Sequence, residues 1–237
     1  MISEELAELM GIHIGDGCIS ITKRYSMYYV GGDLKEEKEY HDNWVSKLFN
    51  KEIMRKLNKE KVRYKEYPST GVYGLYIFDK EITDYFMSLG ICSGSKINQK
   101  IPEIIRQDDL MLKRFLRGLF DTDGNIYFDK NRSCKKPINN VPVIKLGSAA
   151  QYLIKDVFQS LKKLGFNPRL KKPYQGKKDK NPVHTVLIYR KKDIEEYVKE
   201  IGFKNPKHNT KWLLFKKQGF LQPRTTIQQR KRILGLQ

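Results

Sequence analysis

One nine-residue pattern occurs twice in the chain, and this repetition constrains the fold more than any other feature of the sequence. The first copy, LMGIHIGDG, spans residues 9–17, and the second, LRGLFDTDG, spans residues 116–124. Each is an apolar run with a small residue or glycine at its third and seventh places, and each ends in Asp-Gly. Ala7, Gly11 and Gly15 recur at every fourth position, so on a helix they form one ridge. Small residues in a ridge let two backbones approach closely, so we expect two motif helices that pack side by side.

The repetition continues beyond the motifs. Residues 28–49 and 141–166 each indicate a β-strand, a glycine-containing turn and an amphipathic helix, and residues 75–91 align with residues 187–203. The sequence therefore predicts an α+β fold, a tandem pseudo-twofold repeat of αββαββ units with a central pair of packed helices and two antiparallel sheets. We expect an N-terminal half over residues 1–102, a C-terminal half over residues 103–220 and a basic tail over residues 221–237.

Packing of the two motifs has a chemical consequence at their ends. Gly118 holds the place in the second motif that Gly11 holds in the first, so the same register brings Asp16 and Asp123 together. A glycine follows each aspartate, where we expect the helix to end through a left-handed residue. Two carboxylates beside two helix C-termini repel each other strongly. A hard divalent cation such as Mg²⁺ accepts carboxylate and carbonyl oxygens, so the pattern predicts a metal site.

The composition favours a polyanionic partner. The chain has 46 Lys and Arg against 27 Asp and Glu, a net charge of +19, and an isoelectric point near 9.7. Its apolar runs are too short to span a bilayer, so no membrane partner is expected. The three cysteines are odd in number and lack CxxC spacing, which favours a reducing compartment. We expect a cytoplasmic, nucleoid-associated protein, or an organellar one in a eukaryotic host.

The two motifs resemble the paired motifs of LAGLIDADG homing endonucleases in the single-chain, two-motif form. The resemblance implies that Asp16 and Asp123, at the eighth place of each motif, are the metal-binding and catalytic acids. It also implies that the carbonyl groups of Gly15 and Thr122 are backbone ligands. The implied cofactor is Mg²⁺ or Mn²⁺, with Ca²⁺ supporting binding without cleavage.

Some residues in and near the motifs follow the family pattern less closely. The first motif has Ile14 at its sixth place, where the second keeps Asp121, and this loss weakens a structural carboxylate. His13 stands in an otherwise apolar helix, and we expect a packed, hydrogen-bonded core residue there and not a metal ligand. The family also implies basic residues near the scissile phosphates, for which Lys96 and Lys211 are the candidates in the two halves.

The resemblance further implies that the two sheets form a saddle over successive major grooves of double-stranded DNA. The β-rich stretches carry basic and tyrosine side chains that can reach base edges and phosphates. In KVRYKEY, Lys61, Arg63 and Lys65 stand at every second position, so on a strand they would share one face. The candidates for DNA contact are Lys23, Arg24, Tyr25, Tyr28, Lys61, Arg63, Lys65, Lys130, Arg132, Lys145, Arg169, Lys171 and Lys172.

These features together indicate a monomeric, metal-dependent endonuclease that cleaves both strands of DNA at a long, asymmetric site. Two halves with different strand sequences imply a non-palindromic target. The chain starts with Met and lacks an intein's nucleophile at residue 1 and its terminal His-Asn, so we expect an intron-encoded or free-standing enzyme. Two alternatives use the same scaffold, a maturase that binds intron RNA and a DNA-binding regulator that does not cleave. A generic basic RNA-binding protein would explain neither the repeat nor the aspartate pair.

Overall fold

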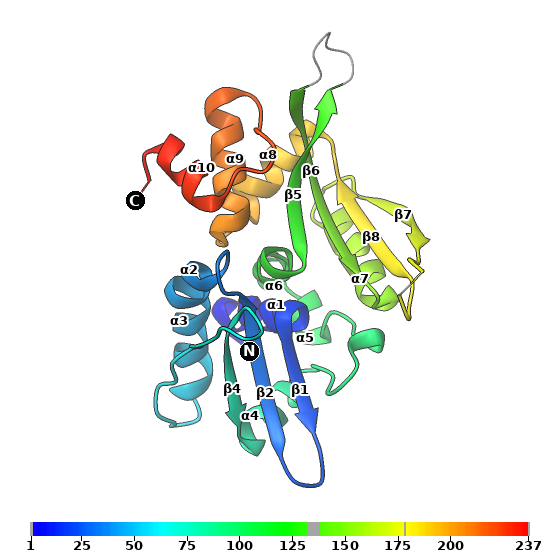
Figure 1. The fold of residues 1–237 in the computed structure, drawn as a ribbon. Helices are drawn as coiled ribbons and strands as arrows, with labels where there is room; N and C mark the ends of the chain where they lie inside the picture. The colour runs from blue at the N-terminus through cyan, green and yellow to red at the C-terminus, as the bar shows by residue number, and fades with distance from the viewer. Residues whose placement is uncertain (1, 132–137, 178, 237) are drawn as a thin grey trace.

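The computed structural model describes residues 2–131, 138–177 and 179–236. The N-terminal part begins with the first motif helix, followed by a hairpin, a helical segment with two π-helical turns, a second strand pair and two short helical elements (Figure 1). Its elements are α1 (Glu4–Asp16), β1 (Gly17–Ile21), β2 (Ser26–Asp33), α2 (Lys38–Tyr40), η1 (His41–Val45), α3 (Ser46–Phe49), η2 (Asn50–Met54), β3 (Lys65–Tyr67), β4 (Val72–Phe78), α4 (Lys80–Ser88) and η3 (Lys96–Asn98).

The rest of the chain repeats this order around the second motif helix and adds two helices. Its elements are α5 (Glu103–Arg106), α6 (Asp109–Thr122), β5 (Gly124–Asn131), β6 (Ile138–Ser148), α7 (Gln151–Lys163), β7 (Arg169–Tyr174), β8 (Val183–Ile188), α8 (Lys191–Glu200), α9 (Pro206–Gln218) and α10 (Ile227–Leu234). The strand orders are β1-β2-β4-β3 and β5-β6-β8-β7, with antiparallel neighbours in both sheets. The predicted α+β repeat is therefore confirmed.

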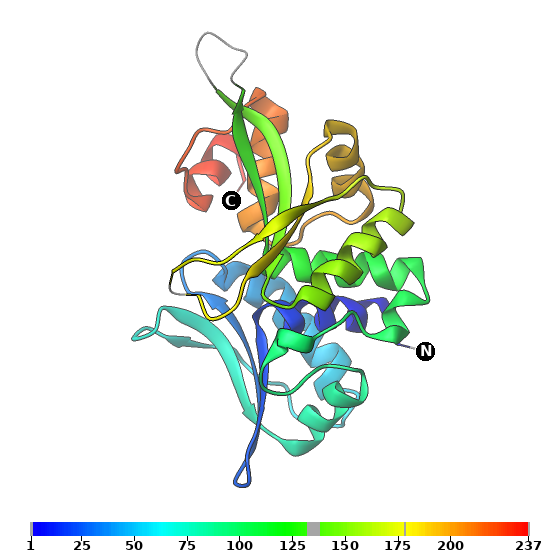
Figure 2. The same cartoon turned by 90° about the vertical axis from the view of Figure 1, so that its right-hand side faces the viewer.

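Each sheet has one face against helices and one face left open by the described residues. In the N-terminal sheet Tyr28, Val30 and Leu75 are buried, and the register pairs Tyr28 with Ile19 and Val30 with Leu75, so these side chains share the covered face. Figures 1 and 2 show α4 behind the first sheet and α7 behind the second, on the same side of the molecule. The two open faces are consequently presented toward the same side.

Helices α1 and α6 cross at the centre of the molecule, with backbone in contact with backbone (Figure 1). A Cβ atom added to Gly11 would lie 2.1 Å from the carbonyl oxygen of Phe115, and one added to Gly118 would lie 2.2 Å from that of Glu8. Ala7 is fully buried on the same helix. Next to this contact the guanidinium of Arg117 and the carboxylate of Glu8 form a buried ion pair between the two halves.

The helix ends differ from the expectation of left-handed glycines. Gly17 has φ −92° and ψ 169°, which is extended backbone, and it begins strand β1. Gly124 likewise begins β5, and its φ is not positive. Space explains these glycines: a Cβ on Gly17 would lie 2.2 Å from Nδ1 of His13, and one on Gly124 would lie 2.4 Å from the carbonyl oxygen of Phe120.

The segment before β3 also differs from the prediction. Lys61 and Arg63 were expected on a strand with Lys65, but β3 begins only at Lys65, which pairs with Gly74. The amide of Val62 donates instead to Oδ1 of Asn50 at 2.8 Å, and Nδ2 of Asn50 donates to the Val62 carbonyl at 3.1 Å. These two hydrogen bonds hold the segment on η2, so it cannot join the sheet.

The C-terminal tail crosses back to the N-terminal half. Helix α10 packs on α9, and Nζ of Lys231 lies 2.7 Å from both carboxylate oxygens of Glu39, which is on α2. Across residues 2–131, 138–177 and 179–236, no helix is long and apolar enough to cross a membrane.

Candidate active site

The two motif aspartates lie at the C-terminal ends of the paired helices. Asp16 is the last residue of α1, and Asp123 caps α6. Asp16 is half-buried, and Asp123 is exposed. Burial raises the pKa of Asp16 from 3.8 to about 8, and the negative charges of Glu37 and Asp123 add to this effect. The two motifs therefore bring their carboxyl groups within electrostatic reach of each other.

Lys96 contacts the end of the first motif directly. Its Nζ donates to the carbonyl oxygens of Ile14 at 2.7 Å, Gly15 at 2.6 Å and Gly17 at 3.0 Å. The predicted backbone ligand Gly15 thus accepts a hydrogen bond from an ammonium group. The protein around Asp123 raises the pKa of its carboxyl group, and the charge of Lys96 opposes that shift.

Lys211 holds the corresponding place in the second half. It is on α9, and its Nζ lies 2.9 Å from Oδ1 of Asn125 and 3.2 Å from the carbonyl oxygen of Ile126, just after the second motif. Burial lowers the pKa of Lys211 to about 8, and the positive charges of Arg230 and Lys207 contribute. Each motif end therefore has one partly buried lysine beside it.

The donor set suits a hard cation that keeps most of its water. Within the ranges that the structure describes, no group of three or more His, Cys, Asp and Glu side chains is arranged to hold a metal. Mg²⁺ does not require such a cage, since one or two carboxylates with water and phosphate oxygens suffice. Asp16 and Asp123 supply two carboxylates, and burial, with the negative charges of Glu37 and Asp123, raises the pKa of Asp16. The hydroxyl of Thr122 donates to the Gly118 carbonyl at 3.0 Å, within its own helix.

His13 is a core residue, as expected, but it is not hydrogen-bonded. Its ring stacks on Tyr28 at 4.9 Å and on Phe86 at 5.2 Å between centroids, and neither ring nitrogen has a partner among the described residues. Burial lowers the pKa of His13 to about 3, so the ring is neutral. Asp121, the sixth residue of the second motif, is fully buried, and its Oδ2 accepts the amide of Lys204 at 2.9 Å.

A third acid, Glu37, belongs to this site and was not predicted. It is buried, and Oε2 accepts the amide of Asp33 at 2.9 Å. Its Oε1 lies 3.1 Å from Nδ2 of Asn205 and 3.4 Å from Nζ of Lys207, both from the other half. In the sequence Glu37 stands within DLKEEKEYHD, a charged run typical of a solvated helix start. No local pattern distinguishes it from its exposed neighbours.

The candidates for DNA contact have several different locations. Lys65, Lys145, Arg169 and Lys171 share the open faces of the two sheets, as their registers with Gly74, Asn125, Leu187 and Thr185 show. The β1–β2 turn holds Lys23, Arg24 and Tyr25. Lys61 and Arg63 are exposed beside η2, and Lys130 and Lys172 are exposed on β5 and β7 beside irregularities in strand pairing. Arg132 lies outside the described residues.

The assignment of Tyr28 to the DNA surface is wrong. Its side chain is 0% exposed and packs on Phe49 and Phe86, with ring centroids 5.1 and 4.7 Å away. The cause is the period of the strand, because Tyr28 points to the covered face and its neighbours Met27 and Tyr29 point to the open one.

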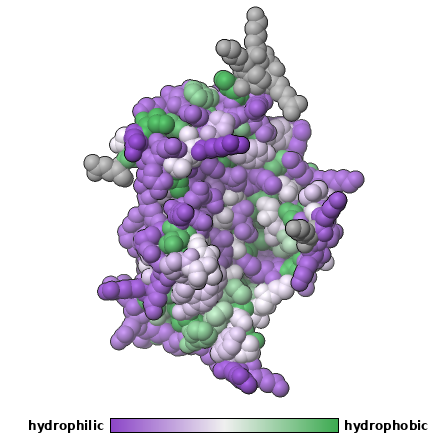
Figure 3. Space-filling model, viewed as in Figure 1, coloured by the Kyte–Doolittle hydropathy of each residue, from purple (hydrophilic) through white to green (hydrophobic). Residues whose placement is uncertain are grey.

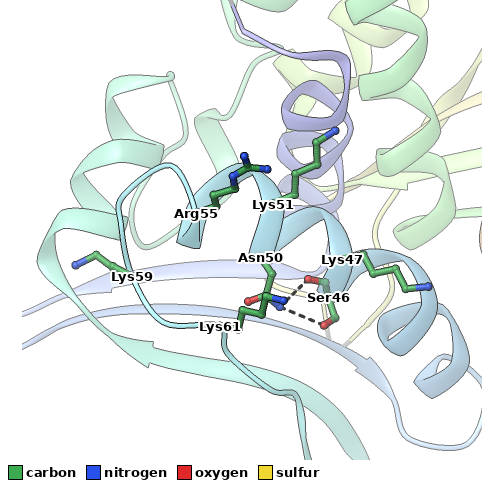
Figure 4. Close-up of a pocket in the computed structure, with 7 residues that line it drawn as sticks. All are labelled: Ser46, Lys47, Asn50, Lys51, Arg55, Lys59 and Lys61. Atoms are coloured by element: carbon green, nitrogen blue, oxygen red, sulfur yellow. Dashed lines mark hydrogen bonds between the residues drawn. The ribbon is translucent and has the colours of Figure 1, made fainter.

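A surface pocket of about 570 Å³ lies elsewhere, on α3, η2 and the loop after them. It is rich in lysine and arginine, but Figure 4 shows the ends of Lys47, Lys51 and Lys59 pointing in different directions. The structure therefore offers no common point there at which these cations could converge on one anion.

Part of the chain matches a known family, and longer parts match known proteins. A model of the LAGLIDADG-like domain family matches residues 111–202. The chain is 27% identical over 203 residues to a replicative DNA helicase DnaB from Synechocystis sp., covering 85% of this chain and 22% of that protein. It is 26% identical over 202 residues to the replication factor C small subunit from Methanocaldococcus jannaschii, covering 85% of this chain and 10% of that protein. The chain thus spans about a fifth or less of these relatives.

Solved structures share the whole fold. The homing endonuclease I-DmoI in complex with DNA and Mn has a TM-score of 0.59 and 19% identity, over 85% of this chain and 98% of that one. The I-LtrWI LAGLIDADG homing endonuclease bound to target DNA has a TM-score of 0.57 and 12% identity, over 92% and 90% of the chains. The N-terminal LAGLIDADG domain of DUF199/WhiA has a TM-score of 0.50 and 15% identity, over 84% and 81%. Residues 111–202 thus match the LAGLIDADG-like domain family, and the two motifs pair at the centre of a fold that LAGLIDADG homing endonucleases share.

Proposed function

We propose that this protein is a double-strand DNA endonuclease that hydrolyses phosphodiester bonds at a long asymmetric site with divalent metal ions. The observation that carries the proposal is the approach of Asp16 and Asp123 at the ends of two backbone-packed helices. Burial and the negative charges of Glu37 and Asp123 raise the pKa of Asp16, and a bound divalent cation would favour its ionised form.

The residues of the site divide the chemistry between them. Asp16 and Asp123 hold the divalent ions, and bound ions would activate water and stabilise the charge on the leaving oxygen. Lys96 and Lys211 place ammonium groups at the two motif ends, where they offset the charge of the phosphates. Glu37 links the two halves through Asn205 and fixes their relative position at the site. The near-symmetric arrangement gives each DNA strand one acid and one lysine.

The proposal assigns duplex DNA to the two open sheet faces. A net charge of +19 attracts the phosphate backbone, and a two-stranded antiparallel ribbon fits a major groove. Because both halves belong to one chain and carry different side chains, a monomer suffices and the target is not palindromic. The fold of I-DmoI, whose structure holds DNA and Mn, supports this assignment.

The matches to curated relatives indicate a segment that occurs within otherwise different proteins. A helicase and a replication factor subunit have different names, yet each matches 85% of this chain over a small part of its own length. The similarity therefore follows a segment that occurs within those proteins and not their named activities. Such a distribution fits a mobile homing enzyme.

A non-cleaving DNA-binding regulator is the second candidate, because DUF199/WhiA also shares the fold. The two functions differ at the motif ends, where a regulator has no need for paired acids. This chain has both Asp16 and Asp123, together with a lysine beside each motif. These residues favour the endonuclease.

The test compares Asp16→Asn and Asp123→Asn with the wild type on a supercoiled plasmid library that carries randomised duplex inserts, with Mg²⁺ present. We expect wild-type protein to linearise a subset of plasmids and each variant to lose at least a hundredfold in rate, with duplex binding retained. Asp84→Asn, a half-buried acid on α4, is the matched control and should cleave normally. Linearisation by either motif variant at the wild-type rate would refute the proposed site, and binding without any cleavage by wild type would favour the regulator.

A further inference from the structure

The open face of the N-terminal sheet is lined by aromatic and apolar side chains. The register places Cys18, Tyr29 and Tyr76 in one row across β1, β2 and β4, and Ser20, Met27 and Phe78 in the next row outward. Two residues along a strand advance about 7 Å, which is about two base pairs of duplex. Figure 3 shows pale and green surface over this sheet, bordered by hydrophilic residues.

The aromatic rings of this face pack on one another, and two of them remain well exposed. Tyr29 and Tyr76 have centroids 4.5 Å apart, and Tyr67 meets Tyr76 edge-on at 5.0 Å. At the outer end Tyr25 meets Phe78 edge-on at 5.6 Å. Tyr76 is still 43% exposed and Phe78 is 67% exposed. The face is therefore a mainly aromatic surface that no described residue covers.

Two glycines make room for the innermost ring. A Cβ atom on Gly31 would lie 2.8 Å from Oη of Tyr29, and one on Gly74 would lie 3.3 Å from its Cε2. These glycines pair with each other, one row closer to the motif end than Tyr29 and Tyr76. Tyr29 therefore extends over the glycine pair toward the candidate active site, and the aromatic face continues to the centre of the molecule.

The C-terminal sheet presents a different surface. Its open face carries Lys145 on β6 and Arg169 and Lys171 on β7, in register with Asn125, Leu187 and Thr185. On the N-terminal sheet the open face has Lys65 at its edge strand, and Lys23 and Arg24 lie at the hairpin tip. Arg169 and Lys171 are on the edge strand β7, as Lys65 is on the edge strand β3, but Lys145 is on the central strand β6. The central strands β2 and β4 of the N-terminal sheet present no cation on their open face.

We propose that the two halves recognise their half-sites by different chemistry, and that the N-terminal aromatic face contacts thymine methyl groups in the major groove. This inference rests on the proposed binding of duplex DNA. The C5 methyl of thymine is the apolar group that a base pair presents in that groove, and apolar side chains recognise it by contact. Cationic side chains on the C-terminal face bind guanine O6 and N7 instead. The bordering lysines and Arg24 hold the phosphates on either side.

The electrostatics of the face agree with methyl contact. Burial, the neighbouring Tyr76 and the charge of Asp16 raise the pKa of Tyr29 to about 12, so the phenol stays protonated and brings no negative charge to the DNA. Tyr29 and Tyr76 pack on each other, and Phe78 keeps most of its ring exposed for contact with a groove wall.

The experiment begins by selecting duplexes from a randomised library with wild-type protein in EDTA, so that metal-dependent cleavage does not deplete them. We expect an enriched site with thymines in one half and guanines in the other. Replacing the thymines of one half-site at a time by deoxyuridine removes only their methyl groups. Affinity should fall about fourfold per methyl in the half-site under the N-terminal sheet and stay unchanged in the other.

Variants assign the effect to the aromatic face. Tyr76→Ala should abolish the uracil penalty in that half-site, whereas Tyr152→Ala, an equally exposed tyrosine on α7, should preserve it. Lys145→Ala should relax the sequence preference of the other half-site only. These side chains are solvent-exposed, so folding is preserved and thermal unfolding can verify it.

The outcomes separate this inference from the function on which it rests. If no duplex is enriched, the proposed DNA recognition fails and the inference fails with it. If a duplex is enriched but uracil has no effect, or has the same effect in both halves, only the methyl-contact inference is refuted. Tighter binding to the single-stranded RNA of the same sequence, lost in Tyr76→Ala, would replace it with base stacking.

Discussion

Replacing Gly11 with alanine tests the central helix contact more directly than any change at Asp16 or Asp123. The added Cβ would lie 2.1 Å from the carbonyl oxygen of Phe115 and 2.9 Å from the amide nitrogen of Leu119. Both neighbours are backbone atoms of α6, so no side-chain rotation can relieve the clash. Ordinary contact begins at 3.4 Å, so the carbonyl must withdraw by 3.4 − 2.1 = 1.3 Å and the helices must separate.

The separation has a cost in stability and a larger one in activity. Overpacking of this kind costs ~1–3 kcal/mol, and a protein of this size loses about 2–4 °C in Tm per kcal/mol. We therefore expect Tm to fall by about 2–12 °C. The same displacement moves Asp16 relative to Asp123, and misplacement of catalytic groups by ~1 Å costs about a hundredfold in rate. Calorimetry and plasmid cleavage below the lowered Tm measure the two effects separately.

The repeat supplies an internal comparison. Gly118→Ala should behave like Gly11→Ala, since its Cβ would lie 2.2 Å from the Glu8 carbonyl. The double variant should lose less than the sum, because one separation relieves both clashes. Gly147→Ala is the control, with its nearest neighbour at 3.4 Å, and should leave Tm unchanged. A Tm for Gly11→Ala within 1 °C of wild type would mean that α1 and α6 do not touch through backbone.

Four further results are expected. The affinity for duplex DNA should fall with salt at about −0.9 per phosphate contacted, for about ten contacts, and a log–log slope shallower than −3 would contradict the saddle. The pKa of Asp16 is raised from 3.8 to about 8, so the folded state binds the extra proton and the contribution of Asp16 to stability falls as pH rises through this window. Without divalent ions, the Tm of Asp16→Asn should exceed that of wild type increasingly from pH 4 to pH 8, and an excess independent of pH would contradict this shift. Glu37→Gln removes the charge that acts most strongly on Asp16 and should move the acidic limb of the pH–rate profile to lower pH, whereas an unmoved limb would place Glu37 outside the site. Lys96→Met should reduce cleavage at least tenfold with DNA affinity retained, and full activity would make its carbonyl contacts only structural.

The order of the elements and the pairing of the motifs could be predicted from the sequence because both depend on local periodicity. Small residues at every fourth place indicate a close helix contact, and the repeat applies the same topology to both halves. The position of Asp16 and Asp123 follows from that register. Local patterns were less reliable at Gly17, where glycine is required by the nearby ring of His13 and not by a positive φ.

Tertiary packing alone decided which side chains lie on the open sheet faces and which support the candidate site. Tyr28 and Tyr29 are adjacent in the sequence, and only the pairing of β2 with β1 and β4 buries one and exposes the other. Glu37 joins the active site because α9 brings Asn205 beside it from a distant part of the chain. Arg117 is a charged residue within an apolar motif, and its buried partner Glu8 comes from the other half. Such pairings depend on energies between segments far apart in sequence, and these segments meet only in the folded protein.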